Sequence, residues 1–141
     1  MILSEETVLK GAESMAIQES GEMYLETIYI LSQGGKGVRA IDVGERMGFS
    51  KPSVSRAMGI LKNEGYVETD ADGFLLLTEK GRATAERTYE RHTVLRQLFI
   101  GLGVSEKTAD EDACRIEHHI SQETFEALKK HAEAAKSGHA F

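Results

Sequence analysis

The sequence predicts a mainly α-helical fold with one small β-hairpin, in which a winged helix-turn-helix is followed by an all-helical lobe. Three observations support this prediction. Apolar residues recur at helical spacing in several segments. Two short helical segments meet at Gly48, with the spacing of a helix-turn-helix unit. Directly after them, the turn signal Asp72-Gly73 lies between two short runs of strand-forming residues, and a hairpin in that place is a wing.

The composition is that of an ordinary soluble globular protein, because 40% of the 141 residues are hydrophobic and 28% are charged. This length supports one medium domain or two small lobes. No apolar run approaches the roughly 18–20 residues that a membrane span needs, and the first twenty residues lack the apolar core of a secretory signal. Cys114 is the only cysteine, so no intrachain disulfide can form, and we expect a cytoplasmic protein.

The N-terminal part is expected to contain three helices. Residues 1–20 are polar and weakly patterned, which predicts a tail or a marginal helix. Apolar residues at helical spacing predict a helix within residues 21–33, and a second follows over residues 38–47, with Gly48 as its C-cap. Ser50 is a suitable N-cap for a third helix that ends near residue 65.

Three further helices are expected after the hairpin. Thr78 can cap a long helix from residue 79 to about 100, and Ser105 can cap another from 106 to about 120. Ser121 can cap a last helix that frays near residue 137. We therefore predict a DNA-binding domain over residues 21–80 and a helical domain over residues 81–141.

The charge distribution favours DNA binding by the first of these domains. The net charge of the chain is −6, which argues against indiscriminate binding to nucleic acid or anionic lipid. Residues 36–66, however, carry six basic and three acidic side chains, a local charge of +3 that leaves −9 for the rest. The alternative to DNA binding is that the helix from Ser50 is simply a capped amphipathic helix whose polar face is solvated. The candidate DNA-contacting residues are basic or small polar side chains and one proline: Arg39, Ser50, Lys51, Pro52, Ser53, Ser55 and Arg56.

A possible metal site begins with the run Cys114-Arg115-Ile116-Glu117-His118-His119. On a helix, positions i, i+3 and i+4 share a face, so Cys114, Glu117 and His118 would converge on one point. A thiolate, a carboxylate and an imidazole form a chelating set for a divalent transition metal. Each residue also has a purely structural explanation, such as a buried cysteine or a solvated histidine pair. His119 points away from the other three and is the weaker candidate.

Several ordered motifs between about residues 22 and 125 resemble the diphtheria toxin repressor family of metal-dependent transcriptional repressors. They are EMYLETIY (22–29), VRAIDVGERM (38–47), SKPSVSRAM (50–58), LLLTEKG (75–81), ERH (90–92) and CRIEHH (114–119). The resemblance implies a homodimer that binds double-stranded operator DNA, with a metal-binding and dimerisation lobe. Independently of the resemblance, we expect no enzyme activity, no organic cofactor and no membrane association.

The resemblance also implies a set of metal ligands. Met23, Cys114, Glu117 and His118 match ligand positions of the iron-responsive branch, whereas Glu26 and His92 match positions used in the manganese-responsive branch. Two departures stand out, because Arg96 replaces an acidic ligand and Asp110 replaces a histidine of the iron branch's second site. That second site is therefore expected to be altered or weak. The chain also has the length of a short form without the additional C-terminal domain of iron regulators.

The donor atoms favour Fe(II) over Mn(II), because thioether and thiolate sulfur are softer than carboxylate oxygen. Mn(II) is the next choice, and Co(II), Ni(II) or Zn(II) are possible surrogates. A metal with ligands in both lobes would restrict the angle between them, and hence the spacing of two reading helices in a dimer. The rival interpretations are a winged-helix repressor that senses an organic ligand, a structural zinc site, and a small metallo-enzyme, which lacks support from any catalytic motif.

Overall fold

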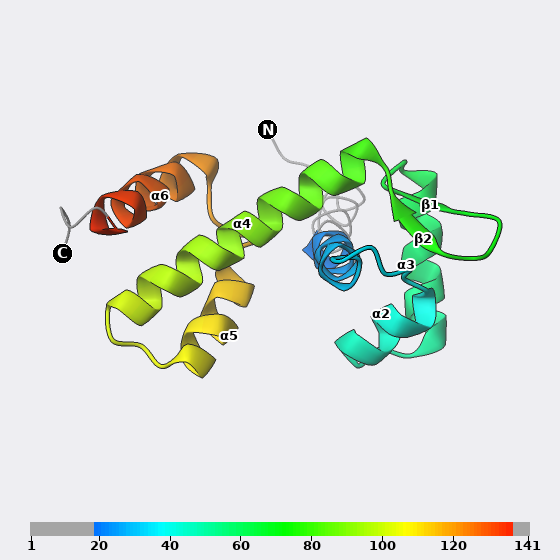
Figure 1. Cartoon of the computed structure of the whole chain (residues 1–141), viewed down its shortest axis with the longest axis horizontal. Coiled ribbons are helices and arrows are strands. Elements are labelled where there is room, and N and C mark those ends of the chain that lie inside the picture. The colour runs from blue at the N-terminus through cyan, green and yellow to red at the C-terminus, as the bar shows by residue number, and fades with distance from the viewer. Residues whose placement is uncertain (1–18, 137–141) are drawn as a thin grey trace, which may run out of the picture. The chain divides into compact units, whose positions relative to one another are not determined.

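The computed structural model describes residues 19–136. The expectation for residues 1–20 lies almost entirely outside this range, although residues 19 and 20 already belong to a helix that continues to residue 31. The remaining elements follow in the predicted order (Figure 1): α2 (Ala40–Met47), α3 (Lys51–Asn63), β1 (Val67–Thr69), β2 (Leu75–Leu77), α4 (Glu79–Gly101), α5 (Glu106–Ile116) and α6 (Gln122–Lys136). The predicted mainly helical class with one hairpin is confirmed.

The chain forms two compact units, Met1–Glu86 and Arg87–Phe141, and the division between them falls within α4. In the described range, no helix combines the length and the apolar character needed to cross a membrane.

The turn between α2 and α3 depends on two glycines. Gly48 adopts a left-handed conformation (φ 72°), and its N–H donates to the carbonyl oxygen of Gly44 at 2.9 Å. Gly44 is buried, and a Cβ atom there would lie 3.3 Å from the carbonyl oxygen of Phe49, a tight contact. The hydroxyl of Ser50 then accepts from the N–H of Ser53 at 3.3 Å and caps α3. The predicted C-cap and N-cap of the helix-turn-helix are therefore confirmed.

The hairpin pairs β1 and β2 antiparallel, with Val67 opposite Leu77. Residues 70–74 form the loop, in which the Asp70 Oδ1 atom accepts from the N–H groups of Asp72 and Phe74, both at 2.9 Å. Leu75 also donates its N–H to the carbonyl oxygen of Val38 at 2.7 Å, which ties the hairpin to the segment before α2. The wing is thus attached to the helix-turn-helix by the backbone.

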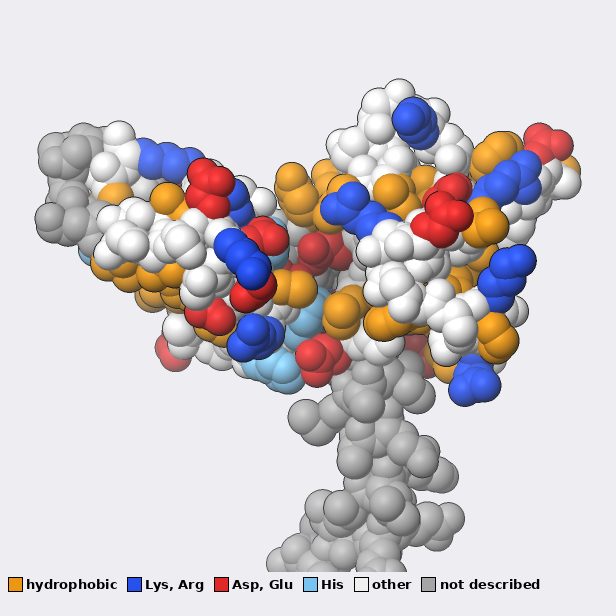
Figure 2. All heavy atoms as spheres, turned by 90° about the horizontal axis from the view of Figure 1, so that it is seen from below, with side chains coloured by type: hydrophobic (Ala, Val, Ile, Leu, Met, Phe, Trp, Pro, Cys, Tyr) orange, Lys and Arg blue, Asp and Glu red, His pale blue; other side chains and the backbone are white. Residues whose placement is uncertain are grey.

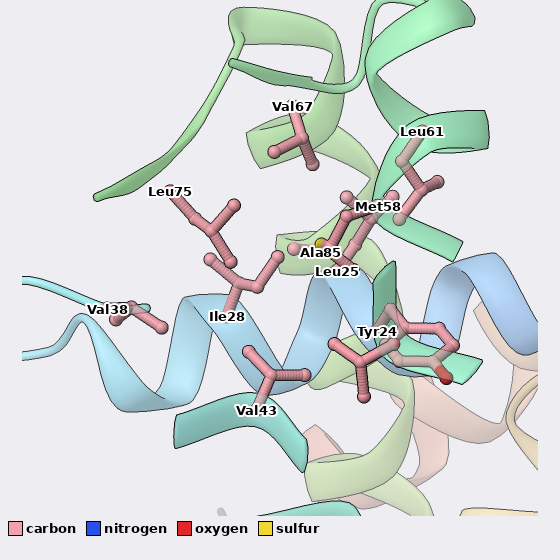
Figure 3. Close-up of a cluster of buried hydrophobic side chains, with 11 residues drawn as sticks. Tyr24, Leu25, Ile28, Val38, Val43, Met58, Leu61, Val67, Leu75 and Ala85 are labelled. Carbon is pink, nitrogen blue, oxygen red and sulfur yellow. The ribbon is translucent and has the colours of Figure 1, made fainter. Parts of the chain in front are cut away.

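The core of the first unit consists of apolar side chains from the first helix, α2, α3, the hairpin and the start of α4 (Figure 3). Tyr24, Leu25 and Ile28 are at most 3% exposed, which confirms the apolar face predicted for the first helix. Burial raises the pKa of the Tyr24 hydroxyl above its usual value. The other buried members are Val38, Val43, Val54, Met58, Leu61, Val67, Leu75 and Ala85.

The second unit contains most of α4, together with α5 and α6. Its core is formed by Leu95 and Leu98 of α4, Ala109 and Ala113 of α5, and Phe125 of α6, all of them buried. An ion pair also joins two of these helices, since the Nζ atom of Lys129 lies 2.8 Å from Oε1 of Glu90. The hydrogen bond that the Lys129 ammonium donates to this carboxylate raises the pKa of Lys129 above its usual value.

The start of α4 packs against the backbone that precedes β1. The Thr78 hydroxyl caps the helix by accepting from the N–H of Gly81 at 3.1 Å, and it donates to the carbonyl oxygen of Gly65 at 2.7 Å. A Cβ atom at Gly81 would lie only 2.0 Å from the carbonyl oxygen of Tyr66. Gly81 therefore permits the close approach between α4 and residue 66.

We predict that Gly81→Ala lowers the free energy of unfolding by about 1–3 kcal/mol, because the added methyl group collides with backbone rather than with a flexible side chain. Urea denaturation followed by circular dichroism measures this change. Gly59→Ala is the matched control, since a Cβ atom at this helical glycine meets nothing within 4 Å. It should stabilise the protein by about 0.4–1 kcal/mol. Equal stability of the two variants would contradict the argument.

Candidate metal centre and nucleic-acid interface

Helix α5 ends earlier than the sequence predicts. Its N-cap is Ser105, as expected, but its last residue is Ile116 rather than a residue near 120. Glu117 keeps helical backbone angles (φ −54°, ψ −28°), and its N–H donates to the carbonyl oxygen of Ala113 at 3.0 Å. His118 lies in the turn that follows. The prediction that a regular helix carries this histidine is therefore wrong, whereas the spacing from Cys114 to Glu117 is helical.

The guanidinium of Arg91 on α4 holds the turn after α5. Its Nη1 atom donates to the carbonyl oxygens of Glu117 (3.2 Å) and Ile120 (2.8 Å), and Nη2 donates to the side-chain oxygen of Gln122 (2.9 Å). These bonds satisfy the carbonyl group of Glu117, the C-cap residue of α5, and that of Ile120 in the segment before α6. Nothing in the local sequence near residue 117 signals this contact, which sequence reasoning missed, because Arg91 lies 26 positions earlier.

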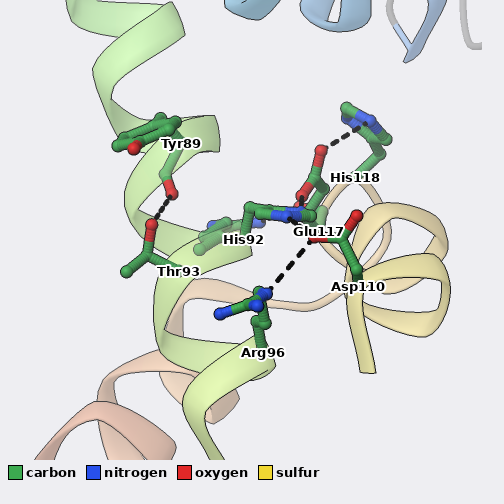
Figure 4. A network of polar contacts seen from close by, with 8 residues as sticks. Tyr89, His92, Thr93, Arg96, Asp110, Glu117 and His118 are labelled. Atoms are coloured by element: carbon green, nitrogen blue, oxygen red, sulfur yellow. Dashed lines mark hydrogen bonds and ion pairs between the residues drawn. The ribbon is translucent and has the colours of Figure 1, made fainter. Parts of the chain in front are cut away.

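The Glu117 carboxylate is the centre of a buried polar cluster (Figure 4). The residue is only 2% exposed. Its Oε2 atom lies 2.8 Å from Nδ1 of His92, and its Oε1 atom lies 3.3 Å from Nε2 of His118. Burial of a carboxylate is costly unless charged or hydrogen-bonding groups compensate it, and here the His92 imidazole forms a hydrogen bond with one oxygen while the His118 imidazole lies beside the other.

The opposite side of the His92 ring contacts Asp110 of α5. The Nε2 atom of His92 lies 2.8 Å from Oδ1 of Asp110, and the same oxygen lies 3.5 Å from Nε of Arg96. Arg96 and Asp110 are the two positions at which the sequence departs from the ligands of the iron branch. The structure shows that they form an ion pair with each other beside His92.

The donor atoms of this cluster fit a divalent transition metal. A carboxylate and neutral imidazoles are established ligands of Fe, Mn, Co and Zn ions. His92, Glu117 and His118 are brought together within the second unit, whereas Cys114 is exposed on α5. Met23 and Glu26, also predicted as ligands, are half-buried on the first helix of the other unit.

The predicted DNA-contacting residues are all exposed in the first unit. They are Arg39, Ser50, Lys51, Pro52, Ser53, Ser55 and Arg56. Lys51 and Ser55 line a groove of about 830 Å³ between α2, α3 and the hairpin. The guanidinium of Arg39 lies 4.2 Å from the centre of the Phe74 ring, which places this charge on the wing. Figure 2 shows one face of the molecule, on which Lys and Arg side chains lie among hydrophobic and acidic ones.

The first unit is a winged helix-turn-helix with an exposed reading helix, and the second contains a buried carboxylate and two imidazoles. Together these features define a class of DNA-binding regulators. Comparison with known proteins specifies the class further. Residues 16–74 match the family model "Iron dependent repressor, N-terminal DNA binding domain", and residues 78–137 match "Iron dependent repressor, metal binding and dimerisation domain".

Individual relatives agree with these matches. The chain is 30% identical over 131 residues to the transcriptional regulator MntR of Escherichia coli O157:H7, covering 91% of this chain and 84% of that protein. It is 33% identical over 113 residues to the iron-dependent repressor IdeR of Mycobacterium bovis, covering 79% of this chain and 49% of that protein. The structure of the manganese regulator SloR superposes with a TM-score of 0.71 at 31% identity, over 78% of this chain and 52% of that chain.

The chain therefore belongs to the diphtheria toxin repressor family of iron- and manganese-dependent transcriptional repressors, as the sequence motifs predicted. Members of this family are transcriptional regulators. The chain spans most of the length of MntR but about half the length of IdeR and of SloR.

We predict that Arg91→Ala lowers the free energy of unfolding by about 1.5–3 kcal/mol, the range for hydrogen bonds to a charged group. Urea denaturation in the presence of a chelator measures this effect. Arg115→Ala is the control, because its pairing with Asp112 is long (3.8 Å) and exposed and should contribute little. If both variants were as stable as the wild type, Arg91 would not hold the turn.

Proposed function

We propose that this chain represses transcription by binding double-stranded operator DNA as a homodimer when a divalent transition metal is bound, and that the metal is Fe(II). The observation that carries the proposal is the buried Glu117 carboxylate between His92 and His118, in the half of the chain that matches a metal-binding and dimerisation domain. The proposed targets are genes of metal homeostasis, and the proposed site of action is the cytoplasm.

The proposed ligand set joins donors from both units: Met23, Glu26, His92, Cys114, Glu117 and His118. A bound divalent cation would supply positive charge that offsets the buried carboxylate and links these donors. His92 and Glu117 need little rearrangement to share an ion, because their nearest nitrogen and oxygen atoms are already 2.8 Å apart. An ion bound by donors of the first helix and by donors of α4 and α5 would restrict the first helix relative to α4 and α5. The bound metal would thereby select one arrangement of the two reading helices in the dimer.

The choice of Fe(II) rests on Met23 and Cys114, whose sulfur atoms are softer than the carboxylates of the manganese branch. The alternative is a Mn(II)-responsive repressor, which is favoured by the similarity to proteins named MntR and to the manganese regulator SloR. Glu26, a position used in the manganese branch, also favours this alternative. Elemental analysis of chain purified without oxygen, combined with operator binding across Fe(II), Mn(II) and Zn(II), distinguishes the two.

The homodimer is proposed to form through the second unit. The family model that matches residues 78–137 describes a dimerisation domain. In the described part of this unit, three large apolar or aromatic side chains are exposed, namely Tyr89 (42%), Leu102 (66%) and Ile116 (37%). These side chains are candidates for burial in the proposed subunit interface. Two reading helices in a dimer would contact two half-sites of a palindromic operator.

We predict that His118→Ala abolishes metal-dependent operator binding, with at least a tenfold loss of metal affinity, because it removes a buried ligand. Fluorescence anisotropy of labelled operator DNA, with Fe(II) or Mn(II) added under anaerobic conditions, measures the effect. His119→Ala is the matched control, since this neighbouring histidine is exposed. Operator binding by the wild type that a chelator does not change would contradict the proposal and favour a regulator of another ligand class.

We predict that Arg56→Ala weakens operator binding and reduces the slope of log affinity against log salt concentration by about 1, because one phosphate contact is lost. Titrations between about 50 and about 200 mM salt measure this slope. Arg115→Ala removes an equal charge from α5 and should leave the slope unchanged. An unchanged slope for Arg56→Ala would exclude this side chain from the DNA interface.

A further inference from the structure

His92 contacts a carboxylate at each of its two ring nitrogens. Nδ1 lies 2.8 Å from Oε2 of Glu117, and Nε2 lies 2.8 Å from Oδ1 of Asp110. Both carboxylates come from α5 or its C-terminal end, and the imidazole of α4 lies between them (Figure 4). Because a carboxylate oxygen only accepts hydrogen bonds, each contact favours a proton on the nitrogen that it faces.

The two carboxylates differ in their surroundings. The Glu117 side chain is 1% exposed, whereas that of Asp110 is 58% exposed. Asp110 also lies 3.5 Å from Nε of Arg96, one helical turn after His92 on α4. A guanidinium has five donors, no acceptor and a permanent charge, so Arg96 offsets the charge of Asp110 and cannot itself bind a metal ion.

We propose that Asp110 and Arg96 are positioning residues for His92, in a site where Glu117 and Nδ1 of His92 face the metal. Asp110 accepts the hydrogen bond from Nε2–H, which keeps the proton on that nitrogen and leaves Nδ1 as the ligand atom. Arg96 holds Asp110 against the ring and neutralises it. Asp110 therefore orients a ligand from outside the site and is not a ligand of a second ion. This inference rests on the proposed function, since it assigns roles around the same metal site.

The Arg96 charge decides between an orienting and a ligating role for Asp110. A second cation bound by Nε2 of His92 and by Asp110 would lie close to the guanidinium, and the two like charges would repel each other. The same guanidinium stabilises Asp110 as a hydrogen-bond acceptor. A histidine ligand whose second nitrogen donates to a carboxylate is a common arrangement in metal sites, and loss of the carboxylate typically lowers metal affinity by about 10–100-fold.

The test uses the full chain and titration with Co(II), whose visible absorption reports the geometry of its ligands. Competition with a chelator gives the affinity, and absorbance against added Co(II) gives the number of ions per chain. We expect Asp110→Ala to bind Co(II) about 10–100-fold more weakly, with an altered spectrum and an unchanged number of ions. Arg96→Ala should change the affinity in the same direction.

Two further variants serve as comparisons. Asp110→Asn keeps an oxygen that can accept from Nε2–H, so it should retain more affinity and a more native spectrum than Asp110→Ala. Asp112→Ala is the matched control, because this carboxylate is on the same helix and pairs with an arginine, Arg115 (3.8 Å), rather than with His92. It should bind Co(II) like the wild type. Circular dichroism confirms that each variant is folded.

Three results would overturn the inference. Wild-type affinity and spectrum in Asp110→Ala would show that Asp110 does not position His92. Loss of one Co(II) per chain in that variant would show that Asp110 is a ligand of a second ion. Both results leave the proposed function intact, because the wild type still binds metal. Failure of the wild-type chain to bind any Co(II) would instead overturn the inference and the proposed function together.

Discussion

The second unit is organised around one buried polar group, the Glu117 carboxylate. An ionised carboxylate in a protein interior costs several kcal/mol unless charges and hydrogen bonds compensate it. Here His92 on α4 forms a hydrogen bond with one carboxylate oxygen, and His118, which immediately follows Glu117 in the chain, lies beside the other. The carboxylate and the imidazoles beside it are also donor types that a divalent metal binds. The cluster that surrounds Glu117 is therefore also suited to hold an ion.

Helix α4 supplies the groups that organise this centre. Arg91 holds the backbone of the turn after α5, His92 contacts the buried carboxylate, and Arg96 pairs with Asp110. These side chains lie within two helical turns of one another, so one rigid element sets their relative positions. Arg91 and Arg96 have supporting roles around the site, because a guanidinium binds carbonyl and carboxylate oxygens but never coordinates a metal ion.

Much of the fold could be predicted from the sequence because its signals are local. The caps at Ser50, Thr78 and Ser105 and the left-handed turn at Gly48 each depend on a few neighbouring residues, and the structure has all four. The end of α5 could not be predicted in this way. Its turn is held by Arg91, which lies in another helix 26 positions away, and no periodicity near residue 117 contains that information.

The sequence by itself determined the family, the order of the elements and the chemical types of the donor atoms, since each is carried by residue identity and short-range spacing. Only the tertiary structure decided which donors meet. It paired Asp110 with Arg96 beside His92, left Cys114 exposed on α5, and buried Glu117. The physical reason is that contacts between helices depend on where each helix ends and how it packs, and these follow from interactions between residues far apart in the chain.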